Sequence, residues 1–408
     1  MKAFILEKYG PPEVLQMAEV EEPAPAGDEA LVRVLAVSVN PADWRSMRAK
    51  PFFSRATLGL LRPKHRIPGV DVAGQVEAVG SGVHDFKPGD EVYANLLDHG
   101  SGGFAEYVSV PVEVMALKPA NLSFEEAAAV PMAAVTALQG LRRHGEIRPG
   151  QRVLINGASG GIGTFAVQIA KSYGSEVTGV TSTRNIDLVD SLGADHVIDY
   201  TTTDFFASGQ RYDLILDTIG NLSVRDLRGA LIEGGKAAVV GFTSVAKLIS
   251  VSLRGGKDVA MVSAHVATTD LEFLSNLIEA GKVHPHIDRR YPFAEIPAAI
   301  TYLERGTPEG RSSWARREIR PRTSPAAHCG LWWSRHKHQG WRGPQPIETP
   351  RSTSTVGMPA GLRRDATASL LRLRRRHPLR LAGADRLVDH LPDLLVQPVL
   401  LPDAVRGP

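Results

Sequence analysis

Four glycines fall within seven residues near the middle of this chain, where residues 156–163 read Asn-Gly-Ala-Ser-Gly-Gly-Ile-Gly. Glycine lets a backbone approach a pyrophosphate closely, and a serine hydroxyl beside it adds a hydrogen-bond donor. The spacing is A-x-x-G-x-G, at Ala158, Gly161 and Gly163, rather than the more common G-x-G-x-x-G. A glycine cluster alone could also be only a structural turn, so its meaning depends on the elements around it.

The residues on either side of this turn supply that context. Residues 153–155 are a continuous apolar run, typical of a strand buried on both faces. Residues 164–173 carry apolar residues among good helix formers, and Gly174 stands where a helix is expected to end. Strand, turn and helix together predict a dinucleotide site. The residues expected to approach its phosphates are Ser159, Gly160, Gly161 and Gly163.

The residues after the next expected strand, 176–180, select between the two nicotinamide dinucleotides. An NAD site usually places Asp or Glu about 20 residues beyond the glycines to hold the ribose 2′-hydroxyl. Here the strand runs into Thr-Ser-Thr-Arg-Asn, so hydroxyl groups and a guanidinium take that place. Donors and positive charge suit a 2′-phosphate. Ser182 and Arg184 therefore favour NADPH, although Arg184 could instead only cap a solvated helix start.

Length and composition limit the class of protein. At 408 residues the chain is long enough for two domains and a tail, and 43% hydrophobic with 22% charged residues is ordinary for a soluble globular protein. The sequence lacks a run of about 18 apolar residues, and Glu7 and Lys8 interrupt any signal-peptide core. The single cysteine, Cys329, excludes a disulfide framework and a cysteine-based zinc cluster within one chain. We therefore expect a cytoplasmic protein.

Two patterns divide the chain and set its expected fold class, α/β. Up to about residue 124, short strand-like runs separated by glycine and proline turns predict a partly open β-barrel. From there, helical patterns alternate with apolar runs, which predicts a doubly wound parallel sheet. A further amphipathic pattern ends at Gly281, and the chain then reads as a return to the first domain. We assign residues 1–124 to a substrate domain, 125–268 to a dinucleotide domain and 269–310 to the return segment.

Several further motifs, in one order, make the sequence resemble a known family. The matching stretches are residues 39–43, 69–74, 87–92, 102–107, 156–163, 192–200 and 277–283. They resemble the medium-chain dehydrogenase/reductase (MDR) superfamily, on its zinc-free quinone oxidoreductase-like or NAD(P)-dependent alcohol dehydrogenase-like branch. The resemblance implies a GroES-like substrate domain, interrupted in sequence by a Rossmann domain, with the active site in the cleft between them. It also implies homodimerisation through the Rossmann domain.

The resemblance also assigns roles to individual residues. The backbone at Ile162 joins the phosphate contacts, and Tyr200 lies against the adenosine. Thr136 approaches the nicotinamide side, and the segment Val240, Gly241 and Phe242 meets the carboxamide. Asn40, Asp43 and Trp44 are expected to form the catalytic side of the substrate pocket. Each has a structural alternative, because Asn and Asp are favoured in turns and an aromatic side chain often only fills a core.

We expect no metal at this site. Zinc-dependent relatives place a cysteine ligand where Asn40 stands here. Asp43, His65 and Glu106 could approach a metal, but they lie at no recognised ligand spacing. Reduction would then depend on holding a carbonyl or conjugated alkene against the nicotinamide while hydrogen-bond donors polarise it.

The last hundred residues differ from the rest. From Gly306 onward there are 17 Arg and 1 Lys against 8 Asp and Glu, and four of the five Trp lie here. The family closes its substrate domain with a strand resembling Gly-Lys-Val-Val-Val, and the codons AAG GTC GTC GTG, after loss of one A, read Arg-Ser-Ser-Trp. Residues 311–314 read the same. We hypothesise that a one-nucleotide deletion put residues 311–408 out of frame, leaving a disordered tail and an exposed sheet edge.

These observations lead to one functional prediction and several alternatives. The chain is expected to be an NADPH-dependent enzyme that reduces a quinone, enal, enone or related carbonyl compound by hydride transfer. The alternatives are the reverse reaction on an alcohol, and a cofactor-binding protein that is catalytically impaired by its tail. A more distant one is nucleic-acid binding through the basic run 372–377 together with Trp332, Trp333 and Trp341, although such runs are more often only solvated.

Overall fold

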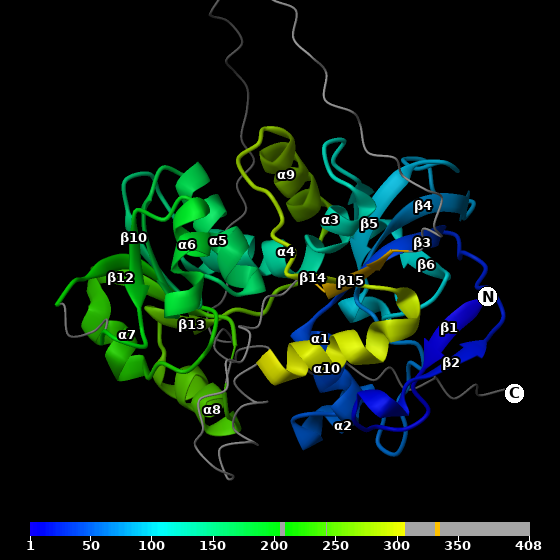
Figure 1. Cartoon of the computed structure of the whole chain (residues 1–408), viewed down its shortest axis with the longest axis horizontal. Helices are drawn as coiled ribbons and strands as arrows, with labels where there is room; N and C mark the ends of the chain where they lie inside the picture. The colour runs from blue at the N-terminus through cyan, green and yellow to red at the C-terminus, as the bar shows by residue number, and fades with distance from the viewer. Residues whose placement is uncertain (205–208, 242, 307–330, 335–408) are drawn as a thin grey trace, which may run out of the picture. The chain divides into compact units, whose positions relative to one another are not determined.

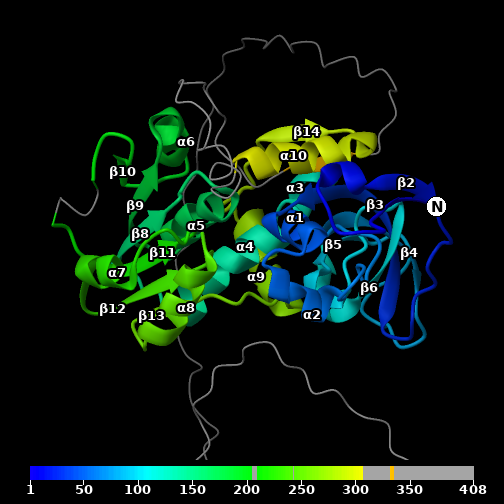
Figure 2. The same cartoon turned by 90° about the horizontal axis from the view of Figure 1, so that it is seen from below.

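The computed structural model describes residues 1–204, 209–241, 243–306 and 331–334. Within them the chain forms a six-stranded sheet, a seven-stranded sheet and a two-stranded ribbon (Figures 1 and 2). None of the helices in this part is long and apolar enough to cross a membrane.

The six-stranded sheet is parallel throughout and has the order β10-β9-β8-β11-β12-β13. Its strands are β8 (Arg152–Asn156), β9 (Glu176–Thr181), β10 (His196–Asp199), β11 (Tyr212–Asp217), β12 (Leu231–Val239) and β13 (Val259–Met261). The helices between them are α5 (Gly161–Ser172), α6 (Ile186–Ser191), α7 (Val224–Ala230) and α8 (Val245–Arg254). The chain builds outward from β8 on one side and from β11 on the other. The predicted doubly wound sheet is confirmed, and its strand order reverses between β8 and β11, where such folds bind ligands.

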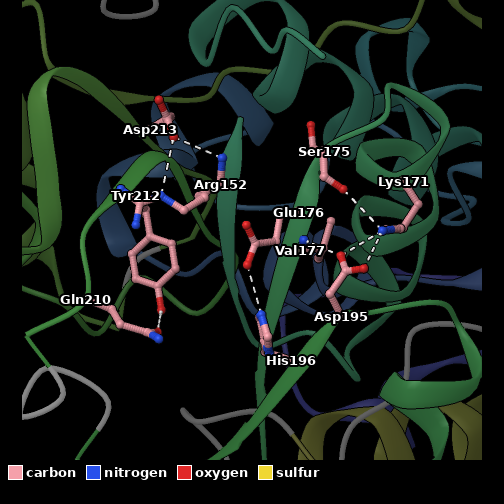
Figure 3. Close-up of polar contacts among 10 residues, drawn as sticks. All are labelled: Arg152, Lys171, Ser175, Glu176, Val177, Asp195, His196, Gln210, Tyr212 and Asp213. Atoms are coloured by element: carbon pink, nitrogen blue, oxygen red, sulfur yellow. Dashed lines mark hydrogen bonds and ion pairs between the residues drawn. The ribbon is translucent and has the colours of Figure 1, made fainter. Parts of the chain in front are cut away.

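Polar contacts tie together the amino ends of these strands (Figure 3). Lys171 Nζ lies 2.7 Å from both carboxylate oxygens of Asp195, and that carboxylate also accepts the N–H of Val177. His196 pairs with Glu176 at 2.9 Å across the starts of β10 and β9. These contacts lie at the opposite edge of the sheet from the carboxyl ends, so the carboxyl ends remain available for a ligand.

The second sheet has the order β14-β15-β3-β4-β5-β7, and β6 also pairs with β3. Its strands are β3 (Glu29–Val39), β4 (Asp71–Val79), β5 (Glu91–Asn95), β6 (Tyr107–Pro111), β7 (Met115–Leu117), β14 (Arg289–Tyr291) and β15 (Leu331–Ser334). Strand β3 is eleven residues long. It pairs with β4 along one edge, and with β6 and then β15 along the other, so it is the centre of the sheet. This sheet is the predicted GroES-like domain. A ribbon of β1 (Lys2–Ile5) and β2 (Gln16–Glu19) lies beside it.

The remaining helices connect and cover the two sheets. The α-helices are α1 (Pro41–Arg48), α2 (Arg55–Leu58), α3 (Phe124–Ala128), α4 (Pro131–Gln139), α9 (Thr268–Glu279) and α10 (Ile296–Gly306). Single turns of tighter helix occur at η1 (Pro12–Val14), η2 (Phe52–Ser54), η3 (Leu97–His99), η4 (Val112–Val114), η6 (Thr183–Asn185) and η7 (Phe293–Glu295), and a wider π-helical turn, η5 (Gly140–His144), follows α4. Ser123 caps α3 with Glu126 in the predicted capping box.

The tail contributes one element that the sequence analysis did not expect. Strand β15 lies between β3 and β14, antiparallel to the first and parallel to the second. These four residues pair along the edge of β3 that the sequence analysis expected to be exposed, so that expectation is wrong along β15. The physical reason is that a sheet edge offers backbone N–H and C=O groups, which any extended segment can pair with regardless of its side chains. The rest of the proposed tail, 311–330 and 335–408, lies outside the described residues.

Candidate active site

The glycine turn connects β8 directly to α5. Gly157 has φ +83°, in the left-handed region that glycine adopts without strain. Gly160 is the N-cap of α5 in an extended conformation, and no side chain caps the helix. A Cβ atom on Gly163 would lie 2.1 Å from the carbonyl oxygen of Gly157, so only glycine lets α5 pack this closely on the turn. The N-terminus of α5 therefore offers backbone N–H groups to an anion.

A cavity of about 810 Å³ opens at the carboxyl ends of the parallel strands. Its lining residues are Asn156, Gly157, Ser159, Gly160, Val180, Thr181, Ser182, Arg184, Asn185, Tyr200, Thr201, Thr202, Thr203, Asp204, Ile219, Asn221, Thr243 and Gly306. Five of the predicted cofactor residues are brought together here, namely Ser159, Gly160, Ser182, Arg184 and Tyr200. The cavity and the uncapped helix end fit the diphosphate and adenosine half of a dinucleotide.

Ser159 is held in one orientation by two neighbours. Its Oγ accepts hydrogen bonds from Thr181 Oγ1 at 2.7 Å and from Asn185 Nδ2 at 3.0 Å. Because both lone pairs of the hydroxyl are then occupied, its own proton is left to donate. Ser159 is thus prepared as a donor toward a phosphate oxygen.

The outer wall of the cavity combines hydroxyl groups with the guanidinium of Arg184 and the carboxylate of Asp204. Ser182 and Arg184 both line it, and Tyr200 is half exposed beside them. The nearby carboxylate of Asp199 accepts from Thr183 and from Thr201, and these donors hold its pKa below the usual value. The Asp199 carboxylate therefore already accepts hydrogen bonds from the hydroxyl groups of Thr183 and Thr201.

The residues expected at the nicotinamide side lie on other elements. Thr136 is buried in α4 and donates its hydroxyl proton to Met132 O at 2.6 Å, so toward a ligand it can only accept. Val240 follows β12, and its N–H donates to Asp217 O at 2.9 Å. Gly241 comes next, and Phe242 lies outside the described residues. Thr136, Val240 and Gly241 do not line the adenosine-side cavity.

The residues expected at the substrate side are buried in the first domain. Asn40 is the N-cap of α1 and forms a capping box with Asp43, whose Oδ2 accepts the Asn40 N–H at 2.7 Å. The Asn40 amide donates to Ser38 Oγ and to Asp71 Oδ2, each at 2.9 Å. Trp44 packs in the apolar core of the domain. The side chains of Asn40 and Asp43 thus hold α1 against the sheet.

Asp71 connects this network to the second domain. Its carboxylate is fully buried and accepts from Ser38 Oγ at 3.0 Å and from Asn95 Nδ2 at 2.6 Å. It also accepts the backbone N–H of Met132, in the first turn of α4, at 3.2 Å. A carboxylate at a helix N-terminus stabilises the helix dipole. Asp71 therefore anchors the start of α4, the helix that carries Thr136, to the substrate domain.

Two buried carboxyl groups in this network differ in their affinity for a proton. Burial raises the pKa of Asp71 to about 6, although the Asn95, Asn40 and Ser38 donors oppose the rise. Burial raises the pKa of Asp43 further, to about 8; the Asn40 N–H lowers it and the Asp71 charge adds to the rise. Asp43 therefore keeps its proton to a higher pH than Asp71 does, which avoids two like charges in one buried site.

Several lining residues escaped the sequence analysis. Asn156 ends β8, and its amide donates to Asp217 Oδ1 at 2.8 Å and to Asn221 Oδ1 at 2.9 Å. Asp217 ends β11 and also accepts the N–H groups of Ile219 and Gly220. The sequence shows that polar residues end both strands, but only the strand order, which sets β8 beside β11, brings them together at one edge of the sheet. Within the described part of the chain, no three His, Cys, Asp or Glu side chains gather to hold a metal ion.

Comparisons with known proteins agree with this architecture. Residues 26–120 match the alcohol dehydrogenase GroES-like domain, and residues 192–311 match the zinc-binding dehydrogenase family. The chain is 36% identical over 324 residues to the NADPH-dependent alkenal/one oxidoreductase of Arabidopsis thaliana chloroplasts, covering 76% of this chain and 78% of that protein. It is 34% identical over 302 residues to the chloroplast envelope quinone oxidoreductase homolog of the same plant, covering 70% and 89%.

Solved structures lead to the same group. The quinone oxidoreductase of Coxiella burnetii superposes with a TM-score of 0.69 at 27% identity, covering 82% of this chain and 99% of that one. The resemblance found in the sequence is confirmed. The chain belongs to the medium-chain dehydrogenase/reductase superfamily, beside the quinone oxidoreductases, and is an oxidoreductase.

Proposed function

We propose that this protein is an NADPH-dependent reductase that transfers a hydride to a quinone, enal, enone or related carbonyl compound without zinc. The observation that carries the proposal is the cavity at the switch point of the parallel sheet, with Ser182 and Arg184 in its wall. The names of the relatives support it, since they include an NADPH-dependent alkenal/one oxidoreductase and quinone oxidoreductases.

The cofactor half of the site lies at the start of α5 and in the cavity wall beside it. The backbone of Gly160, Gly161, Ile162 and Gly163 at the start of α5 holds the diphosphate, and Ser159 donates to it. Ser182 and Arg184 hold the 2′-phosphate, where a guanidinium offers paired donors to phosphate oxygens. Tyr200 packs along the adenosine. When bound, NADPH supplies the hydride.

The catalytic half depends on positioning. Thr136 lies on α4 beside the nicotinamide, and Val240 and Gly241 supply backbone groups for its carboxamide. Asn40, Asp43 and Trp44 form the substrate side by holding α1 in place. Asn40 offers a neutral amide where zinc relatives have a thiolate, and an amide is a poor zinc ligand. Polarisation of the substrate carbonyl therefore falls to hydrogen-bond donors rather than to a Lewis acid.

We further propose that the protein is cytoplasmic and forms a homodimer. The names of the relatives place them in chloroplasts and mitochondria, so cell fractionation is the relevant test of location. Light scattering on the purified full chain tests the dimer, and a monomer mass would contradict it.

The function is tested by following the near-ultraviolet absorbance of NADPH during turnover. The purified full chain is mixed with NADPH and a panel of quinones, alkenals, enones and simple ketones. The proposal predicts NADPH oxidation with at least one conjugated or quinone acceptor, much slower oxidation of NADH, and no loss of rate after EDTA treatment. Activity only after zinc addition, or with NADH alone, would contradict it.

A further inference from the structure

A short segment of the substrate domain has an unusual charge. Residues 45–66 contain seven Arg and Lys and no Asp or Glu, and we name this segment the basic loop. The remaining residues up to 305 carry 22 Arg and Lys against 36 Asp and Glu. The basic loop is therefore a positively charged region on an otherwise acidic body.

The same loop also exposes large apolar side chains. The exposed fractions are 72% for Phe52, 56% for Phe53, 70% for Leu60 and 86% for Leu61. Along the chain, Phe52 and Phe53 precede the single turn of α2 (Arg55–Leu58, labelled in Figure 1), and Leu60 and Leu61 follow it. Exposed large apolar side chains concentrated in one short segment mark a candidate binding surface.

The seven charged groups of the loop differ in their contacts. Arg45 lies over the ring of Trp44, and Arg55 lies over the rings of Tyr9 and Phe52. Arg48 pairs with Glu304, and Arg66 pairs with Glu7 at 2.6 Å, which fastens the loop to the rest of the domain. Lys50, Arg62 and Lys64 are exposed and form no ion pair with any described residue. Three cations thus remain available beside the exposed apolar side chains.

We propose that the basic loop docks on an anionic lipid bilayer. Its cations contact lipid phosphates while the Phe and Leu side chains enter the hydrocarbon boundary, and this combination of two weak signals gives stable peripheral binding. The tail does not complement the loop in charge, because it is itself strongly basic. Leu60 and Leu61 have no stacking face for a nucleic-acid base, whereas hydrocarbon accommodates both residues. Docking does not depend on the proposed reaction.

The test is co-sedimentation of the full chain with vesicles of phosphatidylcholine, with and without phosphatidylglycerol. One variant carries Lys50→Glu, Arg62→Glu and Lys64→Glu, and a second carries Leu60→Ser and Leu61→Ser. The charge-matched control carries Lys87→Glu, Lys257→Glu and Lys282→Glu, all on exposed residues outside the loop. Every protein keeps the same basic tail, so differences between them report on the loop. An unchanged NADPH affinity checks that each variant is folded.

The proposal predicts that the parent and the control bind anionic vesicles and not neutral ones. The loop charge variant binds at least about tenfold more weakly, since each cation near the surface contributes to attraction. The leucine variant also loses binding. Equal binding by parent and loop variants would assign the attraction to the tail and overturn the proposal. Failure of the parent to bind vesicles, with loop-dependent binding to single-stranded RNA instead, would overturn it too.

Discussion

At the scale of single residues, the account depends most on the guanidinium in the cavity wall. Arg184 stands where an NAD-specific site would have a carboxylate, beside the hydroxyl group of Ser182. Its proposed role is to bind the 2′-phosphate, a group that NADPH has and NADH lacks. That difference between two otherwise identical ligands makes the role directly measurable.

Substitution Arg184→Ala should raise the Kd for NADPH by about 10- to 100-fold, the usual cost of losing a charge-assisted hydrogen bond. The Kd for NADH should change little, since it has no 2′-phosphate. Fluorescence titration of both nucleotides measures this. Arg225→Ala, on the exposed side of α7, is the control and should leave both constants unchanged. Equal weakening of both nucleotides would contradict the assigned role.

The protonated carboxyl of Asp43 should make stability depend on pH. Because burial raises its folded pKa to about 8 from an ordinary 3.8, the folded state holds a proton that the unfolded state has lost. Stability conferred by this proton declines as pH rises toward 8. Asp43→Asn cannot titrate, so relative to the variant the parent should lose about 2 kcal/mol between pH 6 and 8. Urea denaturation at each pH measures this.

The control for this prediction is Asp85→Asn, at an exposed position of the same domain, which should leave the pH dependence of the parent unchanged. A stability difference between parent and Asp43→Asn that stays constant from pH 6 to 8 would show that Asp43 is already ionised there.

At the scale of elements, the close packing of α5 on the glycine turn determines where its N–H groups point. A Cβ on Gly163 meets backbone at 2.1 Å, whereas a Cβ on Gly229 in α7 meets nothing within 4 Å. Gly163→Ala should therefore destabilise the fold by about 1–3 kcal/mol and weaken NADPH binding. Gly229→Ala should stabilise it by about 0.5–1 kcal/mol, through the helix propensity of alanine. Urea denaturation of both variants makes the comparison, and equal effects would contradict it.

Local patterns in the sequence predicted the glycine turn and the strands beside it, and they pointed to Ser182 and Arg184, which line the cavity, because each pattern depends on neighbours along the chain. The Asn156–Asp217 pair and the two donors to Ser159 depend on which strands lie side by side, and no local pattern carries that information. Asn40 illustrates the same limit. Its position in a turn was evident, but its contact with Asp71 required the register of β3 on β4.

At the scale of the whole molecule, the tail separates the chain from its relatives. The zinc-binding dehydrogenase match ends at residue 311, where the reading frame is hypothesised to change. A resequenced gene should contain one additional nucleotide near this codon and encode a Lys-Val-Val-Val strand. An unaltered gene sequence that translates to the present tail would contradict the hypothesis.

Strand β15 supplies a second test of the tail. It lies between β3 and β14, so a neighbouring strand lies on whichever side the backbone N–H of Trp332 points to. Trp332→Pro removes that N–H and should cost at least about 1 kcal/mol of stability, measured by denaturation. Trp341→Pro, in the tail beyond the described residues, is the control. Equal stability of the two variants would mean that pairing of β15 adds nothing to the stability of the folded protein.

The most direct test of the central claim is to follow the hydride itself. NADPH deuterated at the reactive carbon of its nicotinamide is incubated with the full chain and an alkenal or quinone acceptor, and the products are analysed by mass spectrometry. The account predicts oxidation of the cofactor, with one deuterium transferred to the alkenal carbon that accepts the hydride, and an undiminished yield in EDTA. With a quinone, the hydroxyl protons of the hydroquinone product exchange with water, so the label is lost. The test is then that one hydroquinone forms for each NADPH oxidised. An alkenal product that carries no deuterium, or a failure of every acceptor to oxidise the cofactor, would contradict it.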